Sequence, residues 1–337
     1  MNEFDFIERL RRHAEKRASA PELVRGIGDD AAVIKQFSGR DTVISADLLI
    51  ENIDFRLEVN PPRLLGHKVL AVSLSDIAAM GARPRWAMLS LGVPQEVWET
   101  NFVEEFYEGF FGLADRYDVR LIGGDLSRTG EKVVVDSVVL GECASGESVS
   151  RFGARPGDCL FVTGALGGSA AGLRLLERGA SLGSHEADAA DIHAIQDLLM
   201  RHLRPEPRVG WGLVLGEEHL ATAMIDISDG LSSDVHHLCH ESNVGVKIQS
   251  ASIPADPLVA GLSGRRALDP LMLALNGGED FELLFAVSPD NISKLPTRVD
   301  GVAVTEIGEV KPAAAGILLS EGSRDWDLQP EGWMHFK

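Results

Sequence analysis

Aspartates at the ends of apolar segments constrain this 337-residue chain more than any other feature. The first two are Asp29 and Asp30, inside the stretch GIGDDAAV at residues 26–33. Two glycines one residue apart allow a sharp turn and a close approach of the backbone to a ligand. Adjacent carboxylates repel each other, and burying either one without a partner is unfavourable. The stretch is therefore either an exposed Asp-rich turn or a place where a carboxylate faces a cation.

Similar aspartates recur along the chain, and the recurrence favours the cation. They are Asp47 (SAD), Asp76 (SLSD), Asp125 (GGD) and the pair Asp226 and Asp229 (DISDG). Taken singly, each is more often a turn former or a helix cap than a ligand. Asp76 is the hardest to explain in this way, because it lies inside an apolar helix pattern. Carboxylates without accompanying His or Cys suit Mg²⁺, which proteins often hold with carboxylates plus substrate phosphates.

Two other motifs carry less weight. The sequence GALGGS at residues 164–169, between a predicted strand and a predicted helix, could cradle a phosphate at the helix N-terminus. It matches neither the Walker A pattern nor GxGxxG, so a tight turn is the favoured interpretation. His236 and His240 have the i, i+4 spacing of zinc ligands, but no plausible third ligand stands near them in the sequence.

The charge balance excludes several classes of partner. Lys and Arg number 32 against 51 for Asp and Glu, and the formal charge of −19 argues against nucleic acid and anionic membranes. The three cysteines, Cys143, Cys159 and Cys239, form no CxxC, so neither a disulfide framework nor a thiolate zinc site is predicted. The acidic N-terminal residues lack an apolar core, and no apolar run approaches about 18 residues. We therefore expect a cytoplasmic protein.

Predicted strands and helices interleave in two halves without strict βαβ alternation, which predicts two α+β domains. The polar, Gly- and Ser-rich residues 141–156 favour a boundary that gives domains 1–145 and 146–337. In the first half we predict strands at 42–47, 86–93, 120–122 and 133–140, and helices at 62–80 and 97–117. In the second half we predict strands at 158–163, 224–226, 244–249, 281–287, 302–307 and 316–319, and helices at 169–177, 192–203, 209–215 and 231–240.

The ordered motifs resemble a known family over about residues 3–336. They are GIGDDAAV, SAD, SLSDIAAMGA, GGD, RFGARPGD, DISDGL, NGGEDFELLF and GWMHF. Together they resemble the thiamine-monophosphate kinase family, part of the ATP-binding superfamily of aminoimidazole ribonucleotide synthetase and selenophosphate synthetase. The resemblance implies an α+β fold with an N-terminal ATP- and Mg²⁺-binding domain that dimerises through its strands, and a C-terminal α+β domain that completes the active site. It also implies transfer of the ATP γ-phosphoryl group to thiamine monophosphate, giving thiamine diphosphate and ADP, in a homodimer.

The resemblance assigns roles to residues that match the family motifs. Several Mg²⁺ ions would be held by Asp30, Ser45, Asp47, Asp76, Asp125, Asp226 and Asp229. ATP would be contacted by Tyr107, Gly123, Gly124, Arg151 and Ser228. Thiamine monophosphate would be contacted by Asp54, Glu279 and Trp333.

Three positions depart from the family pattern. The family commonly has Thr where Ala46 stands and Asn where Ser73 stands, so we expect polar groups to be missing near the metal positions. Position 54 is often His and is Asp54 here, which leaves its substrate contact open. None of these departures removes a metal carboxylate. The acceptor is a phosphate monoester that is largely dianionic at neutral pH, so no general base is needed.

Two alternatives remain at this stage. One is an enzyme of the same superfamily with a different acceptor. The absence of a cysteine before Cys143 and the ending His335-Phe336-Lys337 count against selenophosphate synthetase and the hydrogenase-maturation relatives, and GGEDFELL and GWMHF count against aminoimidazole ribonucleotide synthetase. The other is a non-catalytic protein that binds divalent cations, although no EF-hand pattern supports it.

Overall fold

The computed structural model describes residues 9–10, 12–13, 21–25, 33–36, 38–183 and 189–333. Asp30, most of the GIGDDAAV stretch and the end of GWMHF lie outside these residues. The chain divides into two compact units. The first runs to Gly146 except for Ala78–Gly81, and those four residues cluster with the second, Glu147–Lys337.

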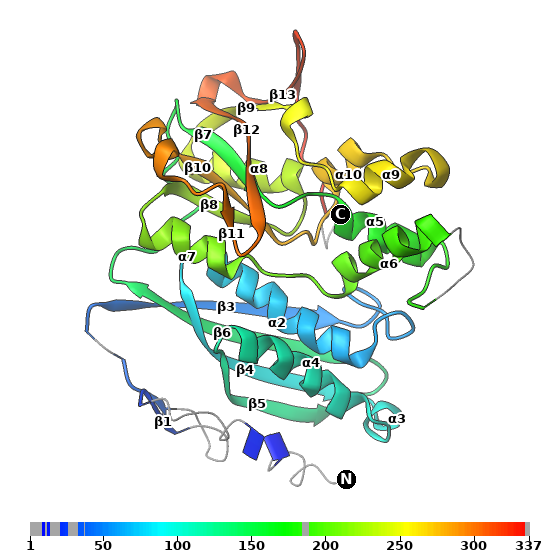
Figure 1. The fold of residues 1–337 in the computed structure, drawn as a ribbon. Helices are drawn as coiled ribbons and strands as arrows, with labels where there is room; N and C mark the ends of the chain where they lie inside the picture. The colour runs from blue at the N-terminus through cyan, green and yellow to red at the C-terminus, as the bar shows by residue number, and fades with distance from the viewer. Residues whose placement is uncertain are drawn as a thin grey trace. The chain divides into compact units, whose positions relative to one another are not determined.

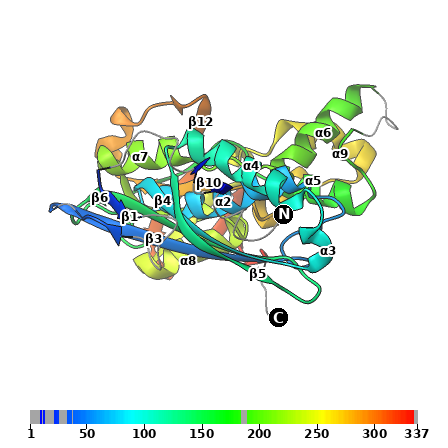
Figure 2. The same cartoon turned by 90° about the horizontal axis from the view of Figure 1, so that it is seen from below.

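The first unit is built on a four-stranded sheet in the order β3-β6-β4-β5. Its strands are β3 (Arg40–Ile50), β4 (Arg83–Val93), β5 (Arg120–Arg128) and β6 (Val134–Ala144). Only the β4–β5 pair is parallel. The long strands twist across one another, as Figure 2 shows. A short antiparallel pair, β1 (Leu23–Arg25) and β2 (Val33–Ile34), precedes the sheet.

Two helices, α2 (Pro62–Ala79) and α4 (Phe102–Arg116), cover one face of this sheet (Figure 1). They approach each other at a pair of glycines. A Cβ atom on Gly66 would lie 1.8 Å from the carbonyl oxygen of Phe106, and one on Gly109 would lie 1.8 Å from that of Arg63. Because neither glycine has a side chain, the two backbones can touch, and both helices carry fully buried apolar side chains.

Two predictions for the first unit need correction. The helix predicted at 97–117 is two helices, α3 (Gln95–Trp98) and α4, because the Thr100 hydroxyl accepts a hydrogen bond from the Phe102 N–H and starts a new helix. The strand predicted at 120–122 continues to Arg128, so Asp125 lies within a strand and not in a turn. Gly124 permits this continuation, because a Cβ atom there would lie 2.0 Å from the carbonyl oxygen of Leu89 on β4.

The second unit contains an eight-stranded sheet in the order β14-β13-β9-β12-β7-β10-β8, with β11 paired to β12. Its strands are β7 (Cys159–Thr163), β8 (Ala221–Ile227), β9 (Val244–Gln249), β10 (Glu282–Val287), β11 (Arg298–Val299), β12 (Val302–Pro312), β13 (Ile317–Glu321) and β14 (Arg324–Asp327). Only the β13–β9 pair is parallel. This antiparallel pattern confirms that the unit is not a doubly wound sheet.

The helices predicted for the second unit are present. They are α5 (Gly168–Glu177), α6 (Ala189–Leu203), α7 (Val209–Glu217) and α8 (Leu231–Ser242). Helix α8 contributes Val235 and Leu238 to the apolar core beneath the sheet.

Two helices that we did not predict are α9 (Pro257–Arg266) and α10 (Pro270–Asn276). Each begins at an Asp-Pro-Leu sequence, and the aspartate side chain caps the helix: Asp256 accepts from the Leu258 N–H and Asp269 from the Met272 N–H. An N-cap aspartate followed by proline is a helix-start signal that the sequence does contain.

The α2–α4 crossing makes a stability prediction. Gly109→Ala forces a methyl group against the Arg63 carbonyl, and we expect it to lower the free energy of unfolding by about 2–3 kcal/mol. Gly112→Ala, in the same helix with open space around it, should instead be neutral or stabilising by up to about 1 kcal/mol. Denaturant unfolding of both variants measures the difference, and equal effects would contradict a crossing set by Gly109.

Candidate functional site

Two serines and two aspartates form what we call the first-unit carboxylate group: Ser45 and Asp47 on β3, and Ser73 and Asp76 on α2. Ser45 and Asp47 are two residues apart on a strand, so they share one face of the sheet. Ser73 and Asp76 are three apart on the helix that covers this face. The Ser73 hydroxyl donates to Asp47 Oδ2 at 2.7 Å, and the Ser45 hydroxyl donates to Asp76 Oδ2.

The electrostatics of this group favour a cation. Burial, and then the negative charges of Asp76 and Asp136, raise the pKa of Asp47 to about 6, although hydrogen bonds from Ser73 and Ser45 lower it. A positive charge beside the two carboxylates would reverse the repulsion that raises this pKa. Asp136, on β6, is a member of this electrostatic environment that the sequence analysis missed.

The structure corrects the expectation for Ser73 and Ala46. Ser73 still supplies a polar group, because its hydroxyl donates to Asp47 and lies 2.6 Å from the Ser137 hydroxyl. Ala46 stands between Ser45 and Asp47 on β3, so its side chain projects from the opposite face of the sheet. Neither departure therefore leaves Asp47 or Asp76 without its serine partner.

Two other predicted site residues of the first unit, Asp125 and Asp54, lie apart from the first-unit carboxylate group. Strand register pairs Asp125 with Ser90, and Ser90 with Asp136, so Asp125 is not brought together with Asp47 and Asp76. The Asp54 side chain accepts from the Ile50 N–H at 2.8 Å and closes the turn after β3.

Tyr107, a predicted ATP contact, is a core residue as the structure places it. Its side chain is 4% exposed and lies against the rings of Phe106, Phe110 and Phe111. Burial raises the pKa of its hydroxyl well above the ordinary value. The other two predicted contacts, Gly123 and Gly124, lie within β5.

Three aspartates form a second-unit carboxylate group: Asp226 at the end of β8, Asp229 in the turn that follows, and Asp234 in the first turn of α8. Asp226 and Asp234 are buried. Asp234 Oδ2 accepts from the N–H groups of Asp229 at 3.2 Å and Gly230 at 3.0 Å. Burial first, and then the charges of Asp226 and Asp229, raise the pKa of Asp234 to about 8. Asp234 is not among the residues predicted from the motifs, although it follows DISDG within five residues.

The C-terminal segment is tied to the same turn. The Trp333 N–H donates to the Asp229 carbonyl at 3.1 Å, and the N–H of Gly332 donates to the hydroxyl of Ser233 at 3.0 Å. The Trp333 side chain is 54% exposed. The ring is therefore not the buried anchor that a C-terminal tryptophan often forms.

The segment NGGEDF, residues 276–281, brings Glu279 to this turn as well. The Glu279 N–H donates to the Ser228 carbonyl at 2.8 Å. Next to it, the Asp280 carboxylate accepts from the N–H groups of Gly167 at 2.7 Å and Ser169 at 3.2 Å, and burial raises the pKa of Asp280 to about 8. The N–H groups that could cradle a phosphate at α5 therefore bind Asp280, which agrees with the tight-turn interpretation of GALGGS.

Arg151 and the histidines of α8 stand apart from these groups as far as their contacts show. The Arg151 carbonyl accepts from the Ser242 hydroxyl at 2.9 Å, and its side chain is exposed. His236 Nδ1 lies 2.6 Å from the Ser232 carbonyl of its own helix. Within the described ranges, no three His, Cys, Asp or Glu side chains are arranged to hold a metal ion, so the zinc interpretation of this helix has no support.

Mg²⁺ does not need three protein carboxylates. It is commonly bound through one or two carboxylates together with substrate phosphates. The atoms that could bind a metal in both carboxylate groups are oxygens, the ligand type that Mg²⁺ prefers. The residues present therefore suit metal sites that phosphate oxygens complete.

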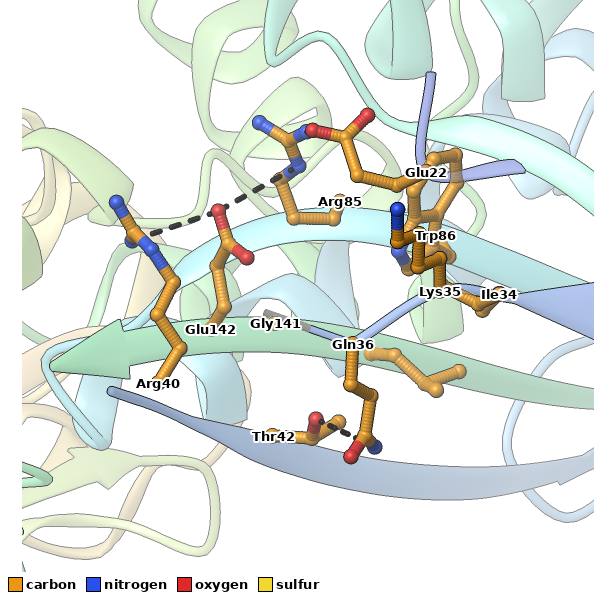
Figure 3. Close-up of a pocket in the computed structure, with 11 residues that line it drawn as sticks. Glu22, Ile34, Lys35, Gln36, Arg40, Thr42, Arg85, Trp86, Gly141 and Glu142 are labelled. Atoms are coloured by element: carbon orange, nitrogen blue, oxygen red, sulfur yellow. Dashed lines mark hydrogen bonds and ion pairs between the residues drawn. The ribbon is translucent and has the colours of Figure 1, made fainter. Parts of the chain in front are cut away.

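Two of the cavities outside the carboxylate groups contain ion pairs. In the first unit, a cavity of about 60 Å³ has Glu142 between Arg40 at 3.5 Å and Arg85 at 3.7 Å (Figure 3). It is too small for a nucleotide. In the second unit, a cavity of about 300 Å³ is lined by Arg208 and Glu282 among others, and the Arg208 guanidinium pairs with the buried Glu282 carboxylate. Among the helices that the structure describes, none combines the length and the apolar character of a membrane-spanning segment.

Comparison with known proteins covers the whole chain. The family model "AIR synthase related protein, N-terminal domain" matches residues 28–143, and the corresponding C-terminal domain matches residues 155–319. The thiamine-monophosphate kinase of Bacillus subtilis (strain 168) is 36% identical over 344 residues, covering 100% of both chains. That of Escherichia coli (strain K12) is 37% identical over 325 residues, covering 95% of this chain and 94% of that protein.

Two solved structures are similar over the same length. The crystal structure of thiamine-monophosphate kinase from Stenotrophomonas maltophilia K279a aligns with a TM-score of 0.82 and 35% identity, covering 96% of this chain and 98% of that one. The structure "AaThiL complexed with AMPPCP and TMP" aligns with a TM-score of 0.77 and 31% identity, covering 99% and 97%. These matches confirm the predicted α+β two-domain fold.

Asp47 makes a prediction about pH and stability. Its folded-state pKa, about 6, lies above the ordinary value of 3.8. The protonated carboxyl group therefore contributes fully to the free energy of unfolding below about pH 4, and this contribution is lost as the pH rises through about 6. We expect Asp47→Asn to stabilise the protein at pH 7.5 in EDTA by about 2 kcal/mol and to flatten the pH dependence between 4 and 7. Thermal unfolding across this range measures the effect.

Asp41, near the start of the same strand, is the matched control. Hydrogen bonds from the Gly146 N–H and the Ser145 hydroxyl lower its pKa, so its contribution is present above the ordinary value and is lost as the pH falls. Asp41→Asn should therefore destabilise the protein at pH 7.5. The same direction of change in both variants would contradict the burial argument.

Proposed function

The chain belongs to the AIR synthase related proteins, in the thiamine-monophosphate kinase family, and we propose that Mg²⁺ ions held by its two carboxylate groups support its reaction. The chain is a phosphotransferase that transfers the γ-phosphoryl group of ATP to thiamine monophosphate, giving thiamine diphosphate and ADP. The observation that carries this function is identity of 36–37% along almost the full length of proteins with that activity.

The proposed metal sites rest on chemistry that phosphoryl transfer requires. The protein contributes mainly positioning and neutralisation of phosphate charge. When bound, Mg²⁺ would neutralise charge on the ATP phosphates. In the first unit, Asp47 and Asp76 would hold it, with Ser45 and Ser73 orienting their carboxylates. In the second unit, Asp226 and Asp229 would hold it, while Asp234 binds the backbone of the turn between them.

Asp30 and Asp125 stay in the proposal as family ligands. The first lies outside the described residues. Strand register places the second in line with Ser90 and Asp136, on the face of the sheet opposite Asp47, so it would contribute from that face. For ATP we propose contacts at Gly123, Gly124, Arg151 and Ser228; the burial of Tyr107 in its aromatic cluster gives the contact expected of it no support.

For the acceptor we propose Glu279, Trp333 and Asp54. Thiamine carries a cationic thiazolium ring, which suits a carboxylate and the face of an aromatic ring. Glu279 and Trp333 are hydrogen bonded through their backbones to Ser228 and Asp229, so both belong to the turn that holds the metal carboxylates. The acceptor phosphate is already largely dianionic near pH 7, so none of these residues has to act as a base.

We also propose that the chain is a homodimer that pairs through the face of the four-stranded sheet opposite α2 and α4. Ile44 is 64% exposed, Leu48 56% and Met88 37%, and register places all three on this face. Such exposed apolar rows favour an interface. Residues 1–145 would then bind ATP and dimerise, and residues 146–337 would supply the remaining ligands. All three cysteines are free thiols, which suits the cytoplasmic location that is part of this proposal.

The function is tested by incubating the purified protein with ATP and Mg²⁺, with and without thiamine monophosphate, and measuring products by mass spectrometry. We expect thiamine diphosphate and ADP in equal amounts, and no product in EDTA. Asp229→Asn should lower kcat by about 100-fold or more, because it removes a proposed metal carboxylate. Asp325→Asn, a surface aspartate paired with Lys247 in the same unit, is the control and should keep full activity.

Each failure has its own meaning. A folded protein that makes no thiamine diphosphate would overturn the function. Full activity in EDTA, or in Asp229→Asn, would overturn the metal assignment and leave the function in place.

The dimer proposal is tested at Leu48. Leu48→Lys places a charge on this exposed apolar face, and we expect it to yield monomers in sedimentation or light-scattering measurements. Trp326→Lys, at an exposed apolar residue on β14 of the second unit, should leave the dimer intact. A wild-type monomer at micromolar concentration would contradict the proposal.

A further inference from the structure

The buried imidazole of His202 contacts the carboxylate of Glu279. His202, near the end of α6, is 7% exposed at its side chain, whereas the Glu279 side chain is 31% exposed. His202 Nδ1 lies 3.0 Å from Glu279 Oε2 and 3.2 Å from the Ser169 hydroxyl. The carboxylate therefore has one side against a buried nitrogen and another that reaches solvent. Neither His202 nor Ser169 belongs to the motifs that carry the family resemblance.

The chemistry of the three groups decides which atom donates. A carboxylate only accepts hydrogen bonds, so the hydrogen of this contact lies on His202 Nδ1. The Ser169 hydroxyl oxygen can accept from the same N–H, and its own backbone N–H donates to Asp280. Ser169 thus connects His202 to the residue next to Glu279 in the chain.

The backbone at Glu279 is held by hydrogen bonds of its own. Glu279 has φ +63°, and Phe281 has φ +49°, a region that L side chains rarely adopt and that is strained for a residue with a Cβ atom. On both sides of Asp280 the chain is hydrogen bonded to the end of β8: the Glu279 N–H donates to Ser228 and the Phe281 N–H to Ile227. These bonds hold the backbone, and they leave the direction of the Glu279 carboxylate to its side-chain contacts.

We propose that His202 is a positioning residue for substrate binding: its Nδ1–H, supported by Ser169, directs the Glu279 carboxylate towards the cationic part of thiamine monophosphate. This inference rests on the proposed substrate contact of Glu279. His202 does not touch the substrate and takes no part in phosphoryl transfer. Its loss should therefore weaken binding of the acceptor and spare the binding of ATP.

The test compares two substitutions at residue 202. His202→Leu removes the donor, and we expect KM for thiamine monophosphate to rise about 10- to 100-fold, with KM for ATP unchanged and kcat within about 3-fold. His202→Asn should restore KM to within a few-fold of the wild type. Its Nδ2 is the same number of bonds from the backbone as Nδ1, and it donates. His193→Leu, at an exposed histidine on the same helix, is the matched control.

A double-mutant cycle with Glu279→Gln separates positioning from general stability. If His202 acts through Glu279, adding His202→Leu to Glu279→Gln should change KM by less than about 2-fold. Multiplication of the two effects, or a rise in the KM for ATP equal to that for the acceptor, would overturn the proposal. Should His202→Leu not fold, His202→Gln serves in its place, because its amide lies one bond further out and cannot occupy the Nδ1 position. A wild-type protein without turnover would instead overturn the proposed function.

Discussion

Repulsion between carboxylates that are held close together in partly buried surroundings is the constraint on which this structure depends. Asp47 and Asp76 face each other across the β3–α2 packing, and Asp226, Asp229 and Asp234 crowd the start of α8. In each group, hydroxyl or backbone donors bind one oxygen of some of the carboxylates: Asp47 and Asp76 in the first unit and Asp234 in the second. These hydrogen bonds stabilise single carboxylates but do not cancel the net negative charge of either group. A divalent cation with phosphate ligands would cancel it, which makes both groups suitable for binding one.

Close contacts between backbone segments hold the elements that carry these carboxylates in place. At the α2–α4 crossing, Gly66 and Gly109 let the helices touch, and α2 is the helix that carries Ser73 and Asp76 over the sheet. At β5, Gly124 lets the strand run on beside β4. Close-packed interiors deform little, so side chains anchored on such elements keep their directions. A phosphotransferase requires this, because its catalytic contribution is mostly position.

In the second unit the same result is reached with hydrogen bonds between segments that are far apart in the chain. The turn after β8 binds the NGGEDF segment through Ser228 and the C-terminal segment through Asp229. The NGGEDF segment in turn binds the start of α5 through Asp280 and is contacted by α6 through His202. An exposed tryptophan and a partly exposed glutamate are thereby held at one turn, an arrangement that suits the cationic acceptor proposed above.

The sequence by itself determined most of the elements, the two α+β halves, the family and the carboxylates of SAD, SLSD and DISDG, because strand alternation, helix periodicity and motif spacing are local properties. Its misses have local causes too: Thr100 splits one predicted helix, and Gly124 extends one predicted strand. Only the tertiary structure decided that Ser73 meets Asp47, that Ala46 faces away from it, that Tyr107 is buried, and that His202 contacts Glu279. These outcomes depend on sheet register and helix packing, which join residues that no spacing along the chain relates.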